Sequence, residues 1–371
     1  MNAPNAAALA DQRFMALALT LGRRGLGRTW PNPAVGAVIV KNGIIAGRGW
    51  TQTGGRPHAE VEALRRAGEA ARGATLYVTL EPCSHHGKSP PCADAIIAAG
   101  VARVVSALED PNPKVAGEGH ARLAAAGIAV DIGIGAEEAR RDHAGHIRRV
   151  RDGRPHVTLK LAISADGKVA AAGRRPIAIT GAEVRDRVHL MRAQSDAIMV
   201  GIGTVLADDP LLTCRLPGME KDSPVRVVLD GDLRLPANSR LVRSAREVPV
   251  WLIAGSHAPS ANEQTLAAAG VDVVPMANRD GQFDMSTVLK LLAERGITRL
   301  MVEGGPMLAA ALVAANLIDE AVLFRSPRSV GADGIDALEG LPLAALTSSP
   351  RLVRVKSEPL GADICDVFER K

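Results

Sequence analysis

Short apolar runs alternate with helix-like segments along the whole chain of 371 residues. This alternation is typical of α/β folds, in which helices pack on the faces of a sheet. The charged stretch RRVRDGRP, residues 148–155, interrupts the alternation and ends in Gly and Pro, which favour irregular structure. The sequence therefore predicts two α/β domains, over residues 1–147 and 156–371, joined by a linker over residues 148–155.

The predicted elements give each domain its own sheet. In the first domain we expect strands at 35–40, 44–49, 76–80 and 103–108, helices at 11–22, 58–67, 91–100 and 118–126, and a short final strand. In the second domain we expect strands at 156–163, 196–200, 225–229, 248–254, 271–275, 299–302, 320–324 and 364–369, and helices at 183–193, 285–295 and 306–317.

Composition excludes several classes of function. The formal net charge is only +5, and aromatic residues make up 2% of the chain, which argues against nucleic acid as the main ligand. No run of 18 apolar residues and no basic, apolar leader is present, so we expect neither a membrane span nor a signal peptide. Four cysteines are too few for a disulfide framework. These features favour a cytoplasmic protein.

Four residues of the first domain match a catalytic zinc site. His58 and Glu60 stand at the start of a predicted helix, and Cys83 and Cys92 each follow a proline after the next strand. A catalytic zinc takes three protein ligands and leaves one position open, and the pattern His-x-Glu, then Pro-Cys, then a second Cys is the signature of zinc deaminases. We predict that His58, Cys83 and Cys92 bind one Zn²⁺ and that Glu60 transfers the proton. The amides at a helix start should help Cys92 to ionise.

A closed structural zinc site is the alternative interpretation of the same residues. Such a site needs a fourth protein ligand, and His85 or His86, between the two cysteines, could supply it. The presence of Glu60 beside the histidine favours catalysis, because a deaminase needs a carboxylate to carry a proton to the departing ammonia.

The spacing of the two cysteines distinguishes among families of zinc deaminases. Eight residues, SHHGKSPP, separate Cys83 from Cys92, whereas many deaminases have Pro-Cys-x-x-Cys. The segments PCSHHGKSPPC, TWPNPAVGAVIV and DPNPKVAGEG closely resemble the deaminase domain of bacterial bifunctional enzymes of the riboflavin pathway, in which a diaminohydroxyphosphoribosylaminopyrimidine deaminase is fused to a reductase. The resemblance implies a cytidine-deaminase-like fold and a phosphoribosylated pyrimidine substrate. It also implies that Asn32 and the loop 110–117 help to form the substrate pocket; their alternative role is turn formation.

The second domain carries a motif suited to phosphate. Residues 302–308, VEGGPML, predict a strand end, two glycines and a helix that begins with proline. Glycine allows close approach of a ligand, and the amides of a first helical turn favour phosphate, although a tight connection explains the motif equally well. Arg192 and Arg215 could bind a phosphate or lie on a solvated surface, and Thr204 and Asp208 could form an ordinary cap or contact a cofactor. The residues alone therefore predict phosphate-bearing ligands, a class that includes dinucleotides.

The second domain also resembles the reductase of the same bifunctional enzymes. The segments that carry the resemblance are KLAISADGKVA, DAIMVGIGTVLADDPLLTCR and VEGGPML. It implies a dihydrofolate-reductase-like fold that binds NADPH. By this resemblance the cofactor contacts are Ala162, Thr204, Asp208, Gly304, Gly305, Pro306, Met307 and Leu308, and the substrate contacts are Arg192, Leu212, Arg215 and Glu303. The family commonly has Ser-x-Trp-Ile-Thr where this chain has Pro176-Ile177-Ala178-Ile179-Thr180, so no role is transferred to Pro176 or Ala178.

The predicted function is therefore a pair of consecutive steps of riboflavin biosynthesis. The deaminase would hydrolyse the 2-amino group of 2,5-diamino-6-(5-phosphoribosylamino)pyrimidin-4-one, and the reductase would use NADPH to convert the ribosyl group to ribityl phosphate. The alternatives are a deaminase of RNA or free nucleosides, a zinc-stabilised binding protein, and an active deaminase with an impaired reductase. A homo-oligomer is compatible with the sequence.

Overall fold

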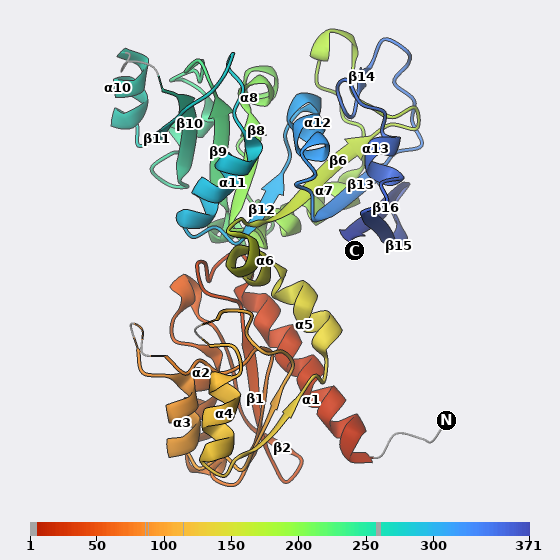
Figure 1. Cartoon of the computed structure of the whole chain (residues 1–371). Helices are drawn as coiled ribbons and strands as arrows, with labels where there is room; N and C mark the ends of the chain where they lie inside the picture. Colours follow the sequence, from red (N-terminus) through yellow and green to blue (C-terminus); the bar gives the residue numbers. More distant parts are fainter. Residues whose placement is uncertain (1–5, 86, 88, 114, 257–260) are drawn as a thin grey trace. The chain divides into compact units, whose positions relative to one another are not determined.

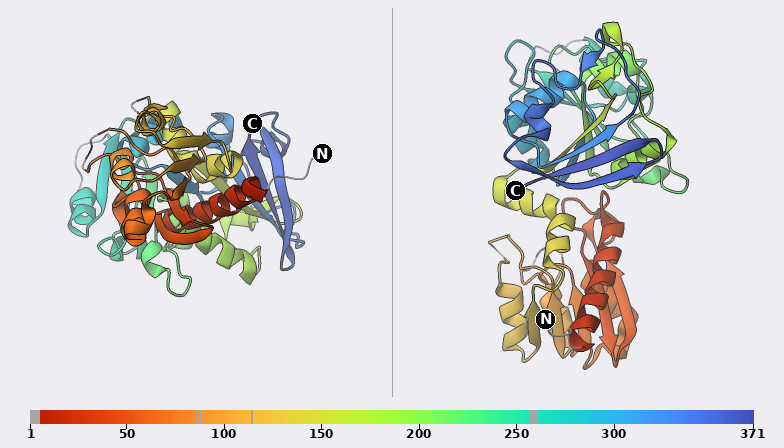
Figure 2. Two further views of the ribbon diagram at one scale, coloured as in Figure 1. Left: turned by 90° about the horizontal axis from the view of Figure 1, so that it is seen from below. Right: turned by 90° about the vertical axis from the view of Figure 1, so that its right-hand side faces the viewer.

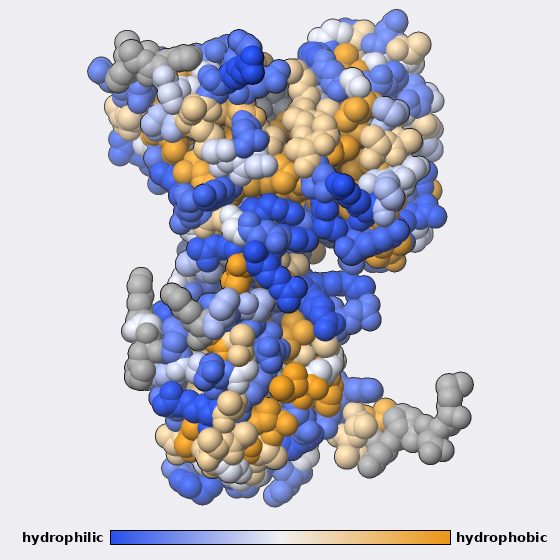
Figure 3. Space-filling view, in the orientation of Figure 1, coloured by the Kyte–Doolittle hydropathy of each residue, from blue (hydrophilic) through white to orange (hydrophobic). Residues whose placement is uncertain are grey.

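The computed structural model describes the chain except for residues 1–5, 86, 88, 114 and 257–260 (Figure 1). It divides into two compact units, Met1–Gly153 and Arg154–Lys371. Among the described residues, no helix is both long enough and apolar enough to cross a lipid bilayer. Hydrophilic side chains cover much of the face shown in Figure 3, where apolar side chains gather only in smaller patches.

The first unit is built on a five-stranded sheet in the order β2-β1-β3-β4-β5. β1 pairs antiparallel with β2 and β3, and the remaining pairs are parallel. The strands are β1 (Gly36–Lys41), β2 (Ile44–Trp50), β3 (Thr75–Val78), β4 (Arg103–Ser106) and β5 (Ala129–Ile132). The helices are α1 (Ala6–Gly22), α2 (Ala59–Ala67), α3 (Cys92–Ala98), α4 (Glu118–Ala125), α5 (Ala136–Asp142) and α6 (Ala144–Asp152). α2, α3 and α4 lie side by side, and α1 contacts α5 (Figure 1).

Glycines let the helices of this unit lie directly on the sheet. A Cβ atom on Gly49 would stand 2.3 Å from the Ala59 carbonyl oxygen, and one on Gly47 would stand 2.2 Å from that of Ala63. A real Cβ could not occupy either position, so α2 contacts the backbone of β2 at both points. This contact fixes the start of α2, where His58 and Glu60 lie.

The second unit contains a nine-stranded sheet in the order β11-β10-β9-β8-β12-β6-β13-β16-β15. The strands from β11 to β13 are parallel, and β16 and β15 add an antiparallel hairpin at one edge (blue strands in Figure 2). The strands are β6 (His156–Ile163), β8 (Ala197–Gly201), β9 (Val225–Asp230), β10 (Val250–Gly255), β11 (Asp272–Met276), β12 (Arg299–Val302), β13 (Glu320–Arg325), β15 (Leu352–Leu360) and β16 (Asp363–Arg370). β7 (Lys168–Ala170) pairs separately with β14 (Ile335–Asp336).

The helices of the second unit are α7 (Ala182–Ala193), α8 (Ile202–Asp208), α9 (Arg240–Arg243), α10 (Ala261–Ala268), α11 (Met285–Glu294), α12 (Pro306–Ala314) and α13 (Ala344–Thr347). Five of them, α8 to α12, each follow a parallel strand of the sheet, whereas α7 and α13 come after β7 and β14. Buried aliphatic side chains of β8, β9 and β10 form one core with α8 and α9. The carboxyl ends of parallel strands therefore meet at one edge of the sheet, where binding sites of α/β folds usually form.

The stretch predicted as a linker is partly helical. Residues 148–152 form the second half of α6, and Gly153, in the left-handed conformation with φ 65°, ends that helix. An ion pair between Arg148 and Asp152, one turn apart, supports the helix, and Ile147 packs against the apolar core of the first unit. The predicted linker therefore contains the last residues of α6 together with Gly153 and Arg154, between which the two units divide.

Candidate active sites

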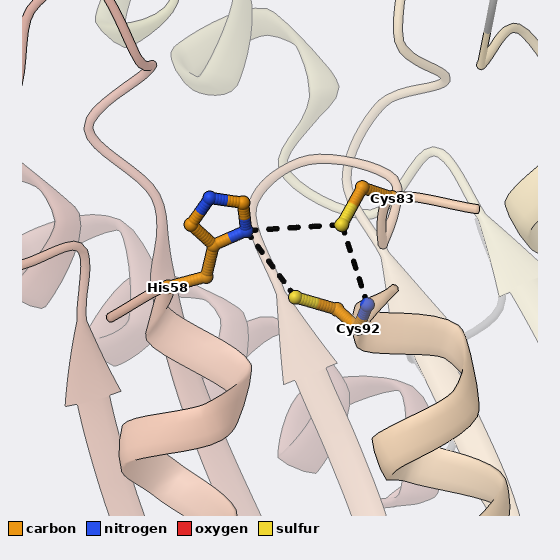
Figure 4. Close-up of side chains that lie close together, drawn as sticks. All are labelled: His58, Cys83 and Cys92. Carbon is orange, nitrogen blue, oxygen red and sulfur yellow. Dashed lines mark hydrogen bonds between the residues drawn. The ribbon is translucent and has the colours of Figure 1, made fainter. Parts of the chain in front are cut away.

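Three elements of the first unit bring His58, Cys83 and Cys92 together (Figure 4). His58 is the N-cap of α2, Cys83 lies in the loop after β3, and Cys92 is the first residue of α3. His58 Nδ1 lies 3.3 Å from Cys92 Sγ and 3.8 Å from Cys83 Sγ. All three potential ligand atoms lie within 4.8 Å of one another.

The two sulfur atoms differ in their electrostatic surroundings. A hydrogen bond with the Cys92 thiol, together with those from His58 and from the Cys92 backbone N–H, lowers the pKa of Cys83 to about 4. Its hydrogen bond with Cys83 and its burial raise the pKa of Cys92. The expectation that the helix start would ionise Cys92 itself is wrong, because the backbone N–H of residue 92 points at the sulfur of Cys83.

This donor set fits a catalytic zinc ion. One imidazole nitrogen and two sulfurs, one of them an ionised thiolate, are ligands that zinc prefers, and three protein ligands leave a fourth position open. Among the described residues no other His, Cys, Asp or Glu joins this group, and His85 is exposed. His86, the other candidate for a closed site, lies outside the described residues.

Glu60 lies in the first turn of α2, two residues after His58, and is only 4% exposed. Burial raises the pKa of the Glu60 carboxyl, and the nearby charge of His58 partly offsets this effect. A buried carboxyl of raised pKa can both take up and release a proton near neutral pH. The arrangement can therefore support proton transfer beside the three-ligand group.

The described residues of the substrate pocket implied by the resemblance lie in turns and loops with defined hydrogen bonds. Asn32 donates from Nδ2 to the carbonyl oxygen of Gly55 at 2.8 Å, and Gly55 lies in the turn just before His58. The loop 110–117 begins at Asp110, whose carboxylate accepts from His146 Nε2 at 2.9 Å and from the Asn112 backbone N–H at 2.9 Å. A third residue, Glu81, holds both ends of this loop and was not singled out from the sequence.

In the second unit, Arg192 and Glu303 form a buried ion pair. Arg192 on α7 donates from Nε and Nη2 to the two carboxylate oxygens of Glu303 at 2.7 and 2.9 Å, and from Nη1 to the Thr213 carbonyl at 3.1 Å. Lys160 Nζ on β6 lies 3.8 Å from the same carboxylate. Burial alone would raise the pKa of Glu303, but Arg192 and Lys160 hold it below its ordinary value. Arg192 is therefore not a solvated surface residue, and Lys160 is a member of the cluster that sequence reasoning missed.

The other predicted substrate residues lie on the loop that follows α8. Leu212 is buried and has a left-handed backbone with φ 55°, an unusual conformation for a leucine. The backbone N–H of Arg215 donates to His189 Nδ1 at 3.3 Å, while its side chain is exposed. α7 thus carries both His189 and Arg192 against this loop.

The predicted cofactor residues come from neighbouring strand ends. Ala162 lies near the end of β6, Thr204 on α8 directly after β8, and Gly304 and Gly305 between β12 and α12. A Cβ atom on Gly305 would stand 3.5 Å from Thr204 Oγ1, so the starts of α8 and α12 are close together. Pro306 is the first residue of α12, Met307 is exposed and Leu308 is buried. Asp208 is the last residue of α8, and burial raises the pKa of its carboxyl group.

Arg226 on β9 is a fully buried cation that contacts the loop around Leu212. Sequence reasoning did not identify it. Its guanidinium donates to the carbonyl oxygens of Leu211, Ser244 and Val248 and to the Ser244 hydroxyl. Burial lowers the pKa of Arg226 to about 10. The carbonyl of Leu211 directly precedes Leu212, so this arginine fixes the loop that carries the predicted substrate residues.

The two folds define a zinc-binding deaminase joined to a reductase domain. Residues 9–108 match the family model described as the cytidine and deoxycytidylate deaminase zinc-binding region, and residues 155–365 match the RibD C-terminal domain. The chain is 42% identical to the riboflavin biosynthesis protein RibD of Escherichia coli K12, over 96% of this chain and 98% of that protein. The chain belongs to the RibD family of riboflavin biosynthesis proteins.

Solved structures agree with this assignment. Acinetobacter baumannii RibD superposes with a TM-score of 0.87 at 36% identity, over 98% of this chain and 99% of that one. A Thermotoga maritima diaminohydroxyphosphoribosylaminopyrimidine deaminase/5-amino-6-(5-phosphoribosylamino)uracil reductase superposes with a TM-score of 0.86 at 34% identity, over 98% and 100%. The predicted fold class, a cytidine-deaminase-like domain followed by a dihydrofolate-reductase-like one, is confirmed, as are the bifunctional enzyme class, the zinc ion and NADPH.

Proposed function

We propose that the chain deaminates 2,5-diamino-6-(5-phosphoribosylamino)pyrimidin-4-one and then reduces the ribosyl group of the product to ribityl phosphate. The observation that carries the first step is the group of His58, Cys83 and Cys92 with the buried Glu60 beside it. The substrate class follows from the family, and the two reactions follow the order of the two domains along the chain.

In the first step, His58, Cys83 and Cys92 would hold zinc, which supplies Lewis-acid activation of water at neutral pH. Glu60 would accept a proton from that water and deliver a proton to the leaving amino group, so that ammonia departs and the ring carbon becomes a carbonyl. Asn32 and the loop 110–117 would orient the pyrimidine.

In the second step, NADPH would supply a hydride to C1 of the ribosyl group, where the bond to the ring oxygen opens, and a proton from solvent would complete the freed hydroxyl group. The start of α12 would bind the cofactor, through Gly304 and Gly305 before the helix and through Pro306, Met307 and Leu308 in its first turn. The other cofactor contacts would be Ala162, Thr204 and Asp208. Arg192, Leu212, Arg215 and Glu303 would hold the substrate, the exposed Arg215 side chain addressing its phosphate. These groups position the sugar carbon rather than perform covalent chemistry.

The decisive experiment combines metal analysis, ammonia release and NADPH oxidation on the pyrimidine phosphate, with a Glu60→Gln variant. We expect about one Zn²⁺ per chain in the wild type, and in the variant retained zinc but ammonia release slowed by at least about a hundredfold. The matched control is Glu62→Gln, a buried acid of the same helix turn that pairs with Arg65 and Arg66. Persistence of full turnover in Glu60→Gln would show that the proton shuttle is wrongly assigned.

The alternative substrates and an impaired reductase are separated by the same assays. Cytidine and tRNA, offered beside the pyrimidine phosphate, should release no ammonia, and activity on tRNA alone would overturn the proposal. The segment 176–180 departs from the family, and Pro176 and Ala178 are exposed. NADPH absorbance should nevertheless fall when the deaminated intermediate is added, whereas its failure to fall would indicate an impaired reductase.

We also propose that the protein works in the cytoplasm and as a homo-oligomer. Its four cysteines are all unpaired, which suits a reducing compartment. β15 is an edge strand of nine residues with Val353 and Val355 exposed, and an exposed edge can pair with a second copy. Light scattering after size-exclusion chromatography tests the second point, and a monomer at micromolar concentration would refute it.

A further inference from the structure

A buried carboxylate ties the loop 110–117 to the metal-binding loop. Glu81 is separated from Cys83 only by Pro82, and its side chain has no exposed surface. Its two oxygens accept four backbone N–H groups at 3.0, 3.0, 2.8 and 3.2 Å, from Asp110, Gly117, Gly119 and His120 in that order. Hydrogen bonds to an ionised acceptor are about twice as strong as neutral ones, so this is a firm attachment.

The two oxygens serve different parts of the same segment. Oε2 accepts from Asp110 and Gly117, which are the two ends of the loop, so that a single atom closes it. Oε1 accepts from Gly119 and His120 in the first turn of α4, whose N-cap Gly117 has no side chain to perform this function. Glu81 thus replaces the missing cap from a distant part of the sequence.

α4 in turn contacts the backbone on both sides of Cys83. A Cβ atom on Gly119 would stand 2.0 Å from the Pro82 carbonyl oxygen, so the helix start presses directly on the residue before the cysteine. Arg122 Nη1 donates to the Ser84 carbonyl, one residue after it, at 3.3 Å. These contacts, besides the bond between Asp110 and His146, set the position of the loop relative to the metal-binding group.

We propose that Glu81 is a substrate-positioning residue of the deaminase: it holds the loop 110–117 at a fixed place beside the metal-binding group. The inference rests on the proposed function, in which this loop forms part of the pyrimidine pocket. Glu81 itself has both oxygens occupied by backbone donors, so it acts through the loop and does not touch the reacting atoms.

The test is Glu81→Gln, which keeps the shape of the side chain and replaces one accepting oxygen by an NH₂ group that cannot accept. Two of the four N–H groups then lose their partner. We expect the KM for the pyrimidine phosphate to rise about tenfold or more, with kcat changed less than about threefold, because loss of positioning weakens binding in ground and transition state alike. Zinc content and NADPH oxidation with the deaminated intermediate should stay at the wild-type level.

The matched control is Glu118→Gln, the same chemical change on an exposed residue between two of the donors. It should leave KM within about twofold of wild type. Loss of zinc from Glu81→Gln would overturn the proposal, since Glu81 would then hold Cys83 rather than the loop. An unchanged KM, or a fall confined to kcat, would overturn it as well. A wild-type protein that releases no ammonia would instead refute the proposed function.

A second measurement decides the matter even if Glu81→Gln does not fold. Hydrogen–deuterium exchange of the wild-type peptide covering residues 109–121 reports on the four bonded amides directly. They should exchange slowly although none lies in a sheet, and saturating pyrimidine phosphate should slow the rest of the loop further. Exchange at the rate of an open loop, or no response to the substrate, would contradict the proposal.

Discussion

In each unit a buried charged side chain fixes a loop near the candidate site, and the two charges have opposite sign. In the first unit the carboxylate of Glu81 collects backbone N–H groups and fixes the loop 110–117. In the second unit the guanidinium of Arg226 collects backbone carbonyls and fixes the loop around Leu212. A carboxylate can only accept hydrogen bonds, so it suits the N–H groups at the start of a helix. A guanidinium can only donate, so it suits turns whose carbonyl groups lack partners. The backbone groups of each loop therefore determine which sign of buried charge can fix it.

The comparison implies that each unit can lose its site without damage to the other. The largest test is Cys92→Ser, which removes a zinc ligand. Zinc should be lost and ammonia release should fall below detection, while NADPH oxidation with the deaminated intermediate stays within about twofold of wild type. Cys365→Ala, a buried thiol of the second unit, is the control and should retain zinc. A parallel loss of reduction in Cys92→Ser would contradict independent sites.

The reverse test is Arg192→Gln. It leaves Glu303 buried beside Lys160 without its bidentate partner, and breaking a buried ion pair typically costs about 3–5 kcal/mol. NADPH oxidation should fall at least about a hundredfold, and chemical denaturation should show a less stable second unit, while ammonia release persists. Arg187→Gln, whose partner Glu358 is more exposed, should change the free energy of unfolding by about 1 kcal/mol or less.

A smaller effect is expected from Arg226→Met, which keeps an apolar stem but removes every donor. The carbonyls of Leu211, Ser244 and Val248 then lose charged partners, and we expect the second unit to lose about 3 kcal/mol of stability. The KM of the reductase should rise while deamination is unaffected. Urea unfolding and paired kinetics measure both quantities, and an unchanged KM would mean that Arg226 only supports the fold.

The smallest effect concerns His120, which is 6% exposed and whose ring nitrogens make no hydrogen bond among the described residues. Burial lowers its pKa, although Glu81 and Glu109 act in the opposite direction. Because the unfolded chain binds this proton more readily than the folded one, the first unit should lose stability as the pH falls below about 6.5. In His120→Leu this loss between pH 7.5 and 5.5 should shrink by about 1 kcal/mol. Thermal unfolding with identical pH dependence in both proteins would refute the assignment.

The zinc group could be predicted from the sequence because its chemistry depends on residue types at characteristic spacing. His58, Glu60, Cys83 and Cys92 are each recognisable from their immediate neighbours. Glu81, Lys160 and Arg226 could not be identified in this way, because their partners are backbone groups or side chains far away along the chain. A charged residue soon after an apolar strand, as Glu81 is after β3, was the one available signal.

The fold could be predicted wherever apolar periodicity was strong. The buried strands β1, β6 and β9 have continuous or alternating apolar patterns and were expected close to their observed bounds. β15 was not predicted, because an edge strand with mostly exposed residues, LVRVKSEPL, gives little alternation. The stretch 148–155 was predicted as a linker from its charges and its final Gly and Pro, and the helical part of it, residues 148–152, gave no clear apolar periodicity, since Gly145 and Ile147 make packing contacts of α6.

The peptide bond between Gly153 and Arg154, where the two compact units meet along the chain, has a consequence for metabolism. Each round of translation delivers one deaminase and one reductase, so their numbers in the cell cannot drift apart through separate control of expression. The balance of the two fluxes is then set only by the kinetic constants of the sites and by how often each unit is unfolded. A substitution that destabilises one unit shifts this balance in a way that no change of gene dosage can correct.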